Sequence, residues 1–345
     1  MVKVVFLAGG SGERFWPKSR KGKPKQFLKL LGENSLLRES FLRIQGFVPE
    51  EAVYLVTYWE HKGLVKQELP EIPEENILGE PMGRNTAPAI LLASFLMDEE
   101  DTMVVLPSDH YIPEKEKFQE TLRRATSLAE KGYLTTIGIK PVRAETGYGY
   151  IEVGEEIEGG FKVKRFREKP SKEVAEEFLA SGRHFWNSGM FIWKVKAFRE
   201  AALKYLPHTY AVLEKAGEFF RDLAWLAQAY EQIESISVDY AIMEKAENVA
   251  MVKGEFLWSD VGSWLSLAEL LGKGGSFLEN PQRVTLAEAS KVMVLGNSKE
   301  IAVLGLENVG FIETEDAILI LDLDKAQEVR KIVAELKEKG KEHLL

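Results

Sequence analysis

The chain begins with Val2-Lys-Val-Val-Phe-Leu-Ala8, followed directly by Gly9-Gly-Ser-Gly-Glu-Arg14. The first segment predicts a short buried strand, and the second predicts a glycine-rich turn at its carboxyl end. Glycines let backbone N–H groups approach phosphate oxygens closely, so the turn predicts a site for a polyanion. It lacks both the third glycine of the dinucleotide fingerprint and the Gly-Lys-Ser/Thr of a Walker loop. The turn therefore indicates a phosphate site of another kind.

A basic loop follows the turn, running from Lys18 to Pro24-Lys25-Gln26-Phe27. Arg14 and Lys25 are suited to neutralise the charge that backbone amides can only orient. The alternative is that these cations form a solvated face or a nucleic-acid patch. The whole chain carries a net charge of −9, and this opposes general binding to nucleic acid.

Composition narrows the class of protein. The 345 residues predict two or three domains of an ordinary globular protein. The absence of cysteine excludes disulfides, thiolate metal sites and cysteine nucleophiles. No apolar run approaches the roughly 18 residues that span a bilayer, and the start lacks a signal-peptide pattern. We expect a cytoplasmic protein with neither a membrane nor a nucleic-acid partner.

The first 140 residues alternate between strand-like and helix-like patterns. This alternation predicts an α/β fold with a doubly wound, mixed but mainly parallel sheet, Rossmann-like in organisation, whose ligands bind beyond the carboxyl ends of the strands. The predicted strands are 2–8, 52–57, 103–106 and 134–139, and the predicted helices are 35–45, 87–97 and 118–130. Shorter strands at 148–153, 161–167, 190–193 and 249–256 and a helical stretch over 197–234, interrupted at Pro207, follow.

A flexible joint is predicted near Gly272–Gly275, because consecutive glycines are costly inside a packed element. We expect it to separate a large first domain at 1–272 from a small C-terminal domain at 276–345. Apolar runs starting at Val292, Ile301, Val309 and Ala317 predict a small β-domain or a few β-helix-like rungs. A final helix should dock through the apolar face that begins at Val329.

Several further segments carry a family resemblance. Together with the turn and basic loop, they resemble the signature of the sugar-1-phosphate nucleotidyltransferases, and Trp16-Pro-x-Ser-Arg20 resembles the mannose-1-phosphate guanylyltransferase branch. The resemblance covers about residues 1–270, and Phe15 stands where leucine is common. The segments are Gly83–Ala89, Pro107–His110, Thr146–Ile151, Glu168–Pro170, Asn187–Phe191, Ser237–Lys245 and Trp258–Trp264.

The resemblance implies an enzyme that transfers GMP from GTP to mannose 1-phosphate and releases pyrophosphate, assisted by Mg²⁺. Arg14 would grip the β- and γ-phosphates, and Lys25 would stabilise charge at the α-phosphate. Asp109 and Asp260 follow predicted strands and are the candidate Mg²⁺ ligands, since Mg²⁺ needs only one or two carboxylates besides phosphate and water. The alternative is that both are turn aspartates bonded to their own backbone.

The predicted binding residues fall into two groups. Glu80 is the candidate guanine reader, because a carboxylate can accept from both N1–H and the N2 amino group; the alternative is a solvent-facing loop glutamate. The nucleotide group is Ala8, Gly9, Gly10, Ser11, Gly12, Glu13, Arg14, Lys25, Glu80, Gly83, Arg84, Asn85 and Ser108. The sugar-phosphate group is Gly149, Glu168, Lys169 and Asn187.

Two alternative functions stay open at this point. One is the same chemistry with another nucleotide or another sugar, such as glucose 1-phosphate. The other is a nucleotide-sensing homologue without catalysis. We expect no phosphomannose isomerase activity, because no histidine-rich metal site follows residue 270. We also expect a homodimer through the C-terminal domain, whose apolar runs exceed what a four-strand unit covers alone.

Overall fold

The computed structural model describes residues 1–10, 12–216, 220–296 and 298–345, and the chain divides into two compact units. The sheet unit comprises Met1–Gly9, Ser40–Ser108 and Ile112–Trp258. The coil unit comprises Gly10–Glu39, Asp109–Tyr111 and Ser259–Leu345. The chain therefore passes between the units five times: inside the glycine-rich turn, after Glu39, before Asp109, after Tyr111 and after Trp258. The domain boundary at residues 272–276 stays a prediction.

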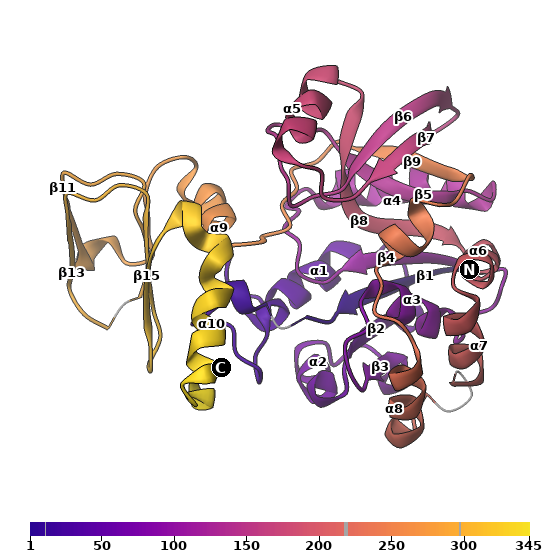
Figure 1. The fold of residues 1–345 in the computed structure, drawn as a ribbon, viewed down its shortest axis with the longest axis horizontal. Coiled ribbons are helices and arrows are strands. Elements are labelled where there is room, and N and C mark those ends of the chain that lie inside the picture. Colours follow the sequence, from indigo (N-terminus) through magenta and orange to yellow (C-terminus); the bar gives the residue numbers. More distant parts are fainter. Residues whose placement is uncertain (11, 217–219, 297) are drawn as a thin grey trace. The chain divides into compact units, whose positions relative to one another are not determined.

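A nine-stranded mixed sheet organises the sheet unit, with strand order β3-β2-β1-β4-β8-β5-β9-β7-β6 (Figure 1). β1 pairs in parallel with β2 and β4, and β8 lies antiparallel between β4 and β5. The strands are β1 Val2–Ala8, β2 Val53–Tyr58, β3 Ile77–Glu80, β4 Thr102–Pro107, β5 Leu134–Ile139, β6 Tyr150–Ile157, β7 Gly160–Arg167, β8 His184–Lys194 and β9 Val249–Gly254.

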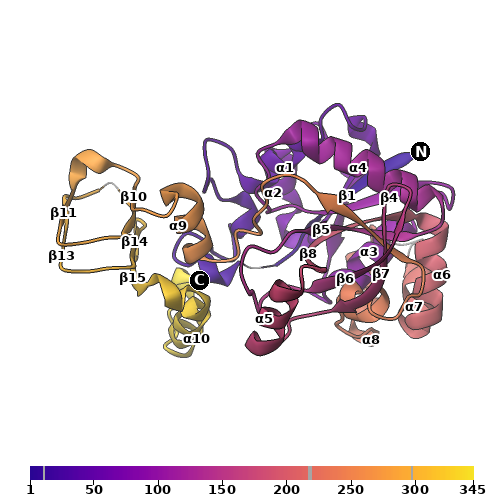
Figure 2. The ribbon, with the colours of Figure 1, turned by 90° about the horizontal axis from the view of Figure 1, so that it is seen from above.

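The central strands are apolar at successive residues because both faces of the sheet are covered. Met103 and Val105 of β4 join a core that includes α3, α6, α7 and α8, while Val104 and Leu106 are buried on the other face. Figure 2 shows α4 on the opposite side of the sheet from α3, α6 and α7. The helices are α1 Leu36–Ile44, α2 Lys62–Glu68, α3 Thr86–Ser94, α4 Lys115–Glu130, α5 Lys172–Ser181, α6 Val195–Tyr205, α7 Pro207–Ala216 and α8 Leu223–Gln232.

The coil unit ends in two small sheets that form a coil of parallel rungs. Phe277 of β10 pairs with Met293 of β12, which pairs with Gly310 of β14, so one turn of the coil takes 16 or 17 residues. In Figure 2, β11 and β13 form one wall and β10, β14 and β15 the opposite wall. Its elements are α9 Trp264–Gly272, β10 Phe277–Leu278, β11 Val284–Ala287, β12 Met293–Leu295, β13 Ile301–Leu304, β14 Val309–Glu313, β15 Ile318–Asp322 and α10 Val329–Glu338.

The same unit contains the basic loop. A short 3₁₀ turn, η1 Glu13–Phe15, comes before this loop at the end of the glycine-rich turn, and a second, η2 Lys25–Phe27, ends the loop. Phe15 and Trp16 are buried in one core with Trp264 of α9, Met293 of β12 and Val329 of α10. Phe15 and Trp16, which join the glycine-rich turn to the basic loop, therefore pack against the coil and its last helix.

The predicted fold, an α/β sheet with a β-helix-like C-terminal part and a final helix, is confirmed. The predicted interruption at Pro207 is confirmed: α6 ends at Tyr205 and Pro207 starts α7, a position that suits the fixed φ and missing N–H of proline. Nowhere in the described residues is there a helix with both the length and the apolar character that a membrane span requires.

Candidate active site

Lys25 brings three of the predicted residues together in the coil unit. Its Nζ donates to Asp109 Oδ2 at 2.8 Å and to the carbonyl oxygen of Asp260 at 2.7 Å. Lys25 is 7% exposed, so its ammonium exchanges water for these two oxygens. Asp109 and Asp260 lie 84 and 235 positions after Lys25 in the sequence, and the fold brings both into contact with its ammonium group.

The glycine-rich turn packs against Lys25 at Gly12. Gly12 has φ +63°, and a Cβ atom there would overlap the side chain of Lys25. Gly10 also has a left-handed φ, of +97°, which favours glycine. Glu13 and Arg14 follow in η1 and are exposed, while Ser11 lies outside the described residues.

The two aspartates differ in their surroundings. Burial alone would raise the pKa of Asp109, but the Lys25 ammonium, with smaller effects from His110 and Arg14, holds this pKa below its usual value. Asp260 Oδ1 accepts from the backbone N–H of Gly262 at 3.1 Å. One oxygen of this carboxylate therefore makes the local backbone hydrogen bond that is typical of an aspartate in a turn.

Backbone strain adjoins Asp260. The next residue, Val261, is fully buried with φ +46°. A β-branched residue rarely adopts this conformation, and such strain gathers at functional sites. Lys169, in the sugar-phosphate group, also has a left-handed φ, of +45°.

Metal binding can be tested against these carboxylates. Within the described residues, no group of three or more His, Cys, Asp or Glu side chains is arranged to hold a metal ion. Asp109 offers a carboxylate oxygen and Asp260 a backbone carbonyl around a position that already favours a cation, the Lys25 ammonium, and the carboxylate of Asp260 belongs to the same segment. This donor set fits a cation that completes its shell with phosphate oxygens and water, as Mg²⁺ does.

Three predicted nucleotide residues lie at strand ends of the sheet unit. Ala8 ends β1, and its carbonyl accepts from Thr57 Oγ1 at 3.0 Å. Gly9 comes next, and Ser108 follows the neighbouring strand β4, donating its N–H to the carbonyl of Leu7 at 3.2 Å. These residues therefore share the carboxyl edge of the sheet, where ligands bind in such folds.

Glu80 is the last residue of β3 and is 5% exposed. The alternative of a solvent-facing loop glutamate is therefore wrong. Tyr230 of α8, which is fully buried, donates its hydroxyl to Glu80 Oε1 at 3.1 Å. Burial raises the pKa of Glu80 to about 8, although the hydrogen bond from Tyr230 lowers it. A Cβ built on Gly9 would lie 3.9 Å from Glu80 Oε2, so this oxygen faces the end of β1.

The neighbours of Glu80 have mainly structural contacts. Arg84 Nε donates to the carbonyl of Tyr230 at 2.7 Å. Asn85 caps α3, with its side chain accepting from the N–H of Thr86 at 2.9 Å. Gly83 leaves room for the hydroxyl of Tyr58, which a Cβ would approach to 2.6 Å. These contacts fix the segment that follows Glu80.

The sugar-phosphate residues also meet. A Cβ on Gly149 would overlap Glu168 Oε2 and lie 3.3 Å from Asn187 Cβ. Burial raises the pKa of Glu168 to about 7, and the Asp239 carboxylate adds to this shift. Glu168 Oε2 is buried with no hydrogen-bond partner, so it is a polar atom available to a ligand.

Asp239 was missed by the sequence reasoning, although it lies in the Ser237–Lys245 segment. It begins a π-helical turn, Asp239–Met243, an element that is rare and frequent at functional sites. Asn187 Nδ2 donates to Asp239 Oδ1 at 2.8 Å, while Asn187 Oδ1 accepts from Thr136 Oγ1 at 3.1 Å. Asn187 therefore has little acceptor capacity left, and Asp239 and Glu168 supply the carboxyl oxygens here.

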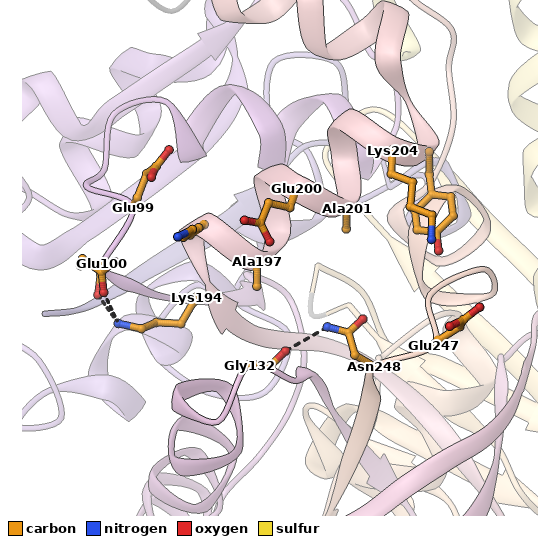
Figure 3. Close-up of a pocket in the computed structure, with 12 residues that line it drawn as sticks. Glu99, Glu100, Gly132, Lys194, Ala197, Glu200, Ala201, Lys204, Glu247 and Asn248 are labelled. Carbon is orange, nitrogen blue, oxygen red and sulfur yellow. Dashed lines mark hydrogen bonds and ion pairs between the residues drawn. The ribbon is translucent and has the colours of Figure 1, made fainter.

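A separate pocket of about 520 Å³ in the sheet unit contains none of the predicted residues (Figure 3). Two of its polar groups are already paired: Lys194 with Glu100, and Asn248 Nδ2 with the carbonyl of Gly132 at 2.9 Å. The pocket therefore gives no support to nucleotide chemistry.

Comparison with known proteins identifies the family. Residues 3–273 match the nucleotidyl transferase family, and residues 282–336 match the MannoseP isomerase/GMP-like beta-helix domain. The chain belongs to the nucleotidyl transferase family. It is therefore an enzyme of the transferase class, and this family generally uses a divalent metal ion.

Individual relatives agree with this assignment. The chain is 39% identical to the xanthan biosynthesis protein XanB of Xanthomonas campestris, over 99% of the chain and 74% of the relative. It is 37% identical to mannose-1-phosphate guanylyltransferase 2 of Escherichia coli O157:H7, over 97% and 73%. A solved structure from Thermus thermophilus, described as a mannose-1-phosphate geranyltransferase, is 32% identical with a TM-score of 0.88, over 97% of this chain and 99% of that one.

Proposed function

We propose that this protein transfers GMP from GTP to mannose 1-phosphate. A phosphate oxygen of the sugar phosphate attacks the α-phosphorus, the bond to the bridging oxygen breaks, and pyrophosphate leaves with the electron pair. The name of the Escherichia coli relative, mannose-1-phosphate guanylyltransferase, supports this choice of substrates. The dianionic nucleophile needs no base, which agrees with a site built from cations and carboxylates.

The observation that carries the proposal is the position of Lys25. Charge develops on the α-phosphate during transfer, and a buried ammonium stabilises it far more than an exposed one. Lys25 is buried and held by Asp109 and Asp260. Arg14 is exposed with a guanidinium suited to the β- and γ-phosphates. The left-handed Gly10 and Gly12 allow backbone N–H groups to face the same phosphates.

Asp109 and Asp260 would hold Mg²⁺, the finer assignment of the family's divalent ion. Bound there, the ion would withdraw negative charge from the phosphate oxygens. The Lys25 ammonium would then contact phosphate oxygens of the substrate in addition to the two aspartates. The protein's own contribution is to keep the Asp109 carboxylate ionised, which its lowered pKa favours.

Glu80 is proposed as the guanine reader. Ionised, its two oxygens accept from N1–H and the N2 amino group, a donor pair that adenine lacks. The test is the GTP-to-ATP preference of Glu80→Gln, measured as the ratio of kcat/KM values. An amide cannot accept from both donors without placing its own NH₂ against one, so the preference should fall at least about tenfold. An unchanged ratio would refute the assignment.

Gly149, Glu168, Lys169 and Asn187 are proposed to bind mannose 1-phosphate, with Asp239 added from the structure. Lys169 supplies the positive charge, and the carboxyl oxygens of Glu168 and Asp239 accept from sugar hydroxyls. Pyrophosphate release measured for mannose 1-phosphate and glucose 1-phosphate, each with GTP and ATP, tests the substrate choice. Equal rates with glucose 1-phosphate would favour a broader sugar specificity, and no release with any pair would favour a nucleotide-sensing homologue.

We also propose a homodimer through the C-terminal coil. Ile318 and Ile320 are 50% and 65% exposed on the edge strand β15, and alternate residues share one side of a strand. Light scattering of the purified protein should give twice the chain mass, and Ile320→Lys should give the monomer. A monomeric wild-type protein would overturn this proposal. A cytoplasmic location stays a prediction from composition.

A further inference from the structure

The end of the coil unit contacts Arg14, the last residue of the glycine-rich turn, through a hydrogen bond. We use the name tail for residues 323–345, which include the 3₁₀ turns Leu323–Glu328 and Glu342–Leu344 and helix α10. Arg14 Nη1 donates to Gln327 Oε1 at 2.9 Å. The two residues lie 313 positions apart, so the contact depends on the fold of the whole unit.

The tail and its neighbours in the coil unit also hold the residues that follow Arg14. The carbonyl of Leu344 accepts from Trp16 Nε1 at 2.8 Å and from Arg20 Nη1. Arg20 Nη2 donates to Asp316 Oδ1 at 2.7 Å. Trp264 Nε1 donates to the carbonyl of Trp16 at 3.1 Å, so the loop backbone is fixed as well. Arg14 therefore lies two residues before a backbone position that other parts of the coil unit hold in place.

The partner of Arg14 is neutral, although a carboxylate is next to it in the sequence. Glu328 follows Gln327, and its carboxylate pairs with Lys325 at 3.4 Å and with Lys331 at 2.6 Å. An amide oxygen orients a guanidinium without cancelling its charge, whereas a carboxylate would compete with phosphate for the same N–H groups. The guanidinium has five N–H groups, so one bond to Gln327 leaves the others for a ligand.

We propose that Gln327 is a positioning residue that orients Arg14 for the triphosphate of GTP. This inference rests on the proposed function, because it needs Arg14 to bind phosphate. Holding the side chain before the nucleotide arrives removes an ordering cost from binding. The effect of Gln327 should therefore appear in the affinity for GTP and not in the affinity for the sugar phosphate.

The test compares KM for GTP, KM for mannose 1-phosphate and kcat across Gln327→Ala, Gln327→Glu and the control Gln282→Ala, which changes an exposed glutamine of the same unit. Gln327→Ala should raise KM for GTP about three- to tenfold, the range of one lost hydrogen bond. Gln327→Glu should raise it further, because a carboxylate neutralises Arg14, while leaving the unfolding temperature equal or higher. A purely structural contact would instead tolerate the glutamate. KM for the sugar phosphate and the Gln282→Ala enzyme should stay at wild-type values.

A double-mutant comparison decides whether Gln327 acts through Arg14. In an Arg14→Ala background, Gln327→Ala should cause no further rise in KM for GTP. A further rise, or wild-type KM values for both Gln327 variants while Arg14→Ala raises KM, would overturn the inference. If Arg14→Ala itself leaves KM for GTP unchanged, the phosphate-binding role of Arg14 fails instead, and with it that part of the proposed function.

Discussion

Replacing Tyr230 with Phe should weaken GTP binding in a way that depends on pH. The Tyr230 hydroxyl donates to Glu80 Oε1 at 3.1 Å inside the core of the sheet unit. Phe keeps the buried ring and removes only this donor. The carboxylate form of Glu80 then loses a stabilising hydrogen bond, so the pKa of Glu80 rises beyond its value of about 8.

The size of the effect follows from that shift. A hydrogen bond to a charged group contributes about 1.5–3 kcal/mol, and about 1.4 kcal/mol corresponds to one pKa unit. We take one unit as the lower estimate. At about pH 7.5, a pKa near 8 leaves roughly a quarter of Glu80 ionised, and a pKa near 9 leaves about 3%. If guanine requires the ionised form, the Kd for GTP should rise about eightfold at this pH.

Isothermal titration of GTP into both proteins, from about pH 6.5 to 9, provides the measurement. The ratio of the two Kd values should be largest at low pH and decline as pH rises through the pKa of each protein. Titration of the nucleotide itself cancels in this ratio. Tyr205→Phe is the matched control, because its hydroxyl donates to the carbonyl of Lys245 at 3.0 Å in the same unit and has no contact with Glu80.

Two results would refute the reasoning. A ratio that stays constant across the pH range would show that Tyr230 does not act through the ionisation of Glu80. A ratio of one at all pH values would show that Glu80 does not bind guanine as a carboxylate. In either case the Glu80→Gln variant would still report whether this side chain affects base choice.

Three further variants test other parts of the site. Gly12→Ala should weaken GTP binding about tenfold, because the backbone of Gly12 is left-handed and a Cβ there would overlap Lys25. The control Gly22→Ala places its Cβ in open space and should bind GTP normally. Equal Kd values for the two variants would contradict this prediction. Lys25→Met should lower kcat about 100-fold, and Lys29→Met, at an exposed lysine, is the control. A loss under about tenfold would show that Lys25 does not stabilise the transition state of the transfer. Asp239→Ala should raise KM for mannose 1-phosphate about tenfold with KM for GTP unchanged; a parallel rise in both would indicate general damage.

The central sheet could be predicted because its strands are buried on both faces. The predicted strand 134–139 is the observed β5, since a short run rich in isoleucine and threonine, bounded by Gly132 and Pro141, is typical of a strand. β3 was missed. It has four residues, Ile77–Glu80, too few for a periodic pattern. The burial of Glu80 was therefore hidden, although its position before Pro81 and Gly83 had marked it as a candidate.

The contacts of the site could be predicted only in part. Residue types next to a strand end pointed to Asp109 and Asp260, but no spacing rule predicts that one ammonium contacts both. Tyr230 lies 150 positions from Glu80, and Gln327 lies in the tail, where an exposed glutamine has no pattern to distinguish it. Such partners depend on which elements the fold brings together, and a single sequence carries that information only weakly.

The direction of β15 has a consequence for the evolution of the coil. Each parallel rung presents the same edge to the next, so a stack of rungs has no intrinsic end and could grow by duplication. β15 runs antiparallel to β14, and a further parallel rung would not find the hydrogen-bonding pattern that the earlier rungs share. β15 therefore ends the stack of parallel rungs and limits how many rungs the coil contains. New rungs are expected among related proteins as insertions before β14, and not as additions after β15.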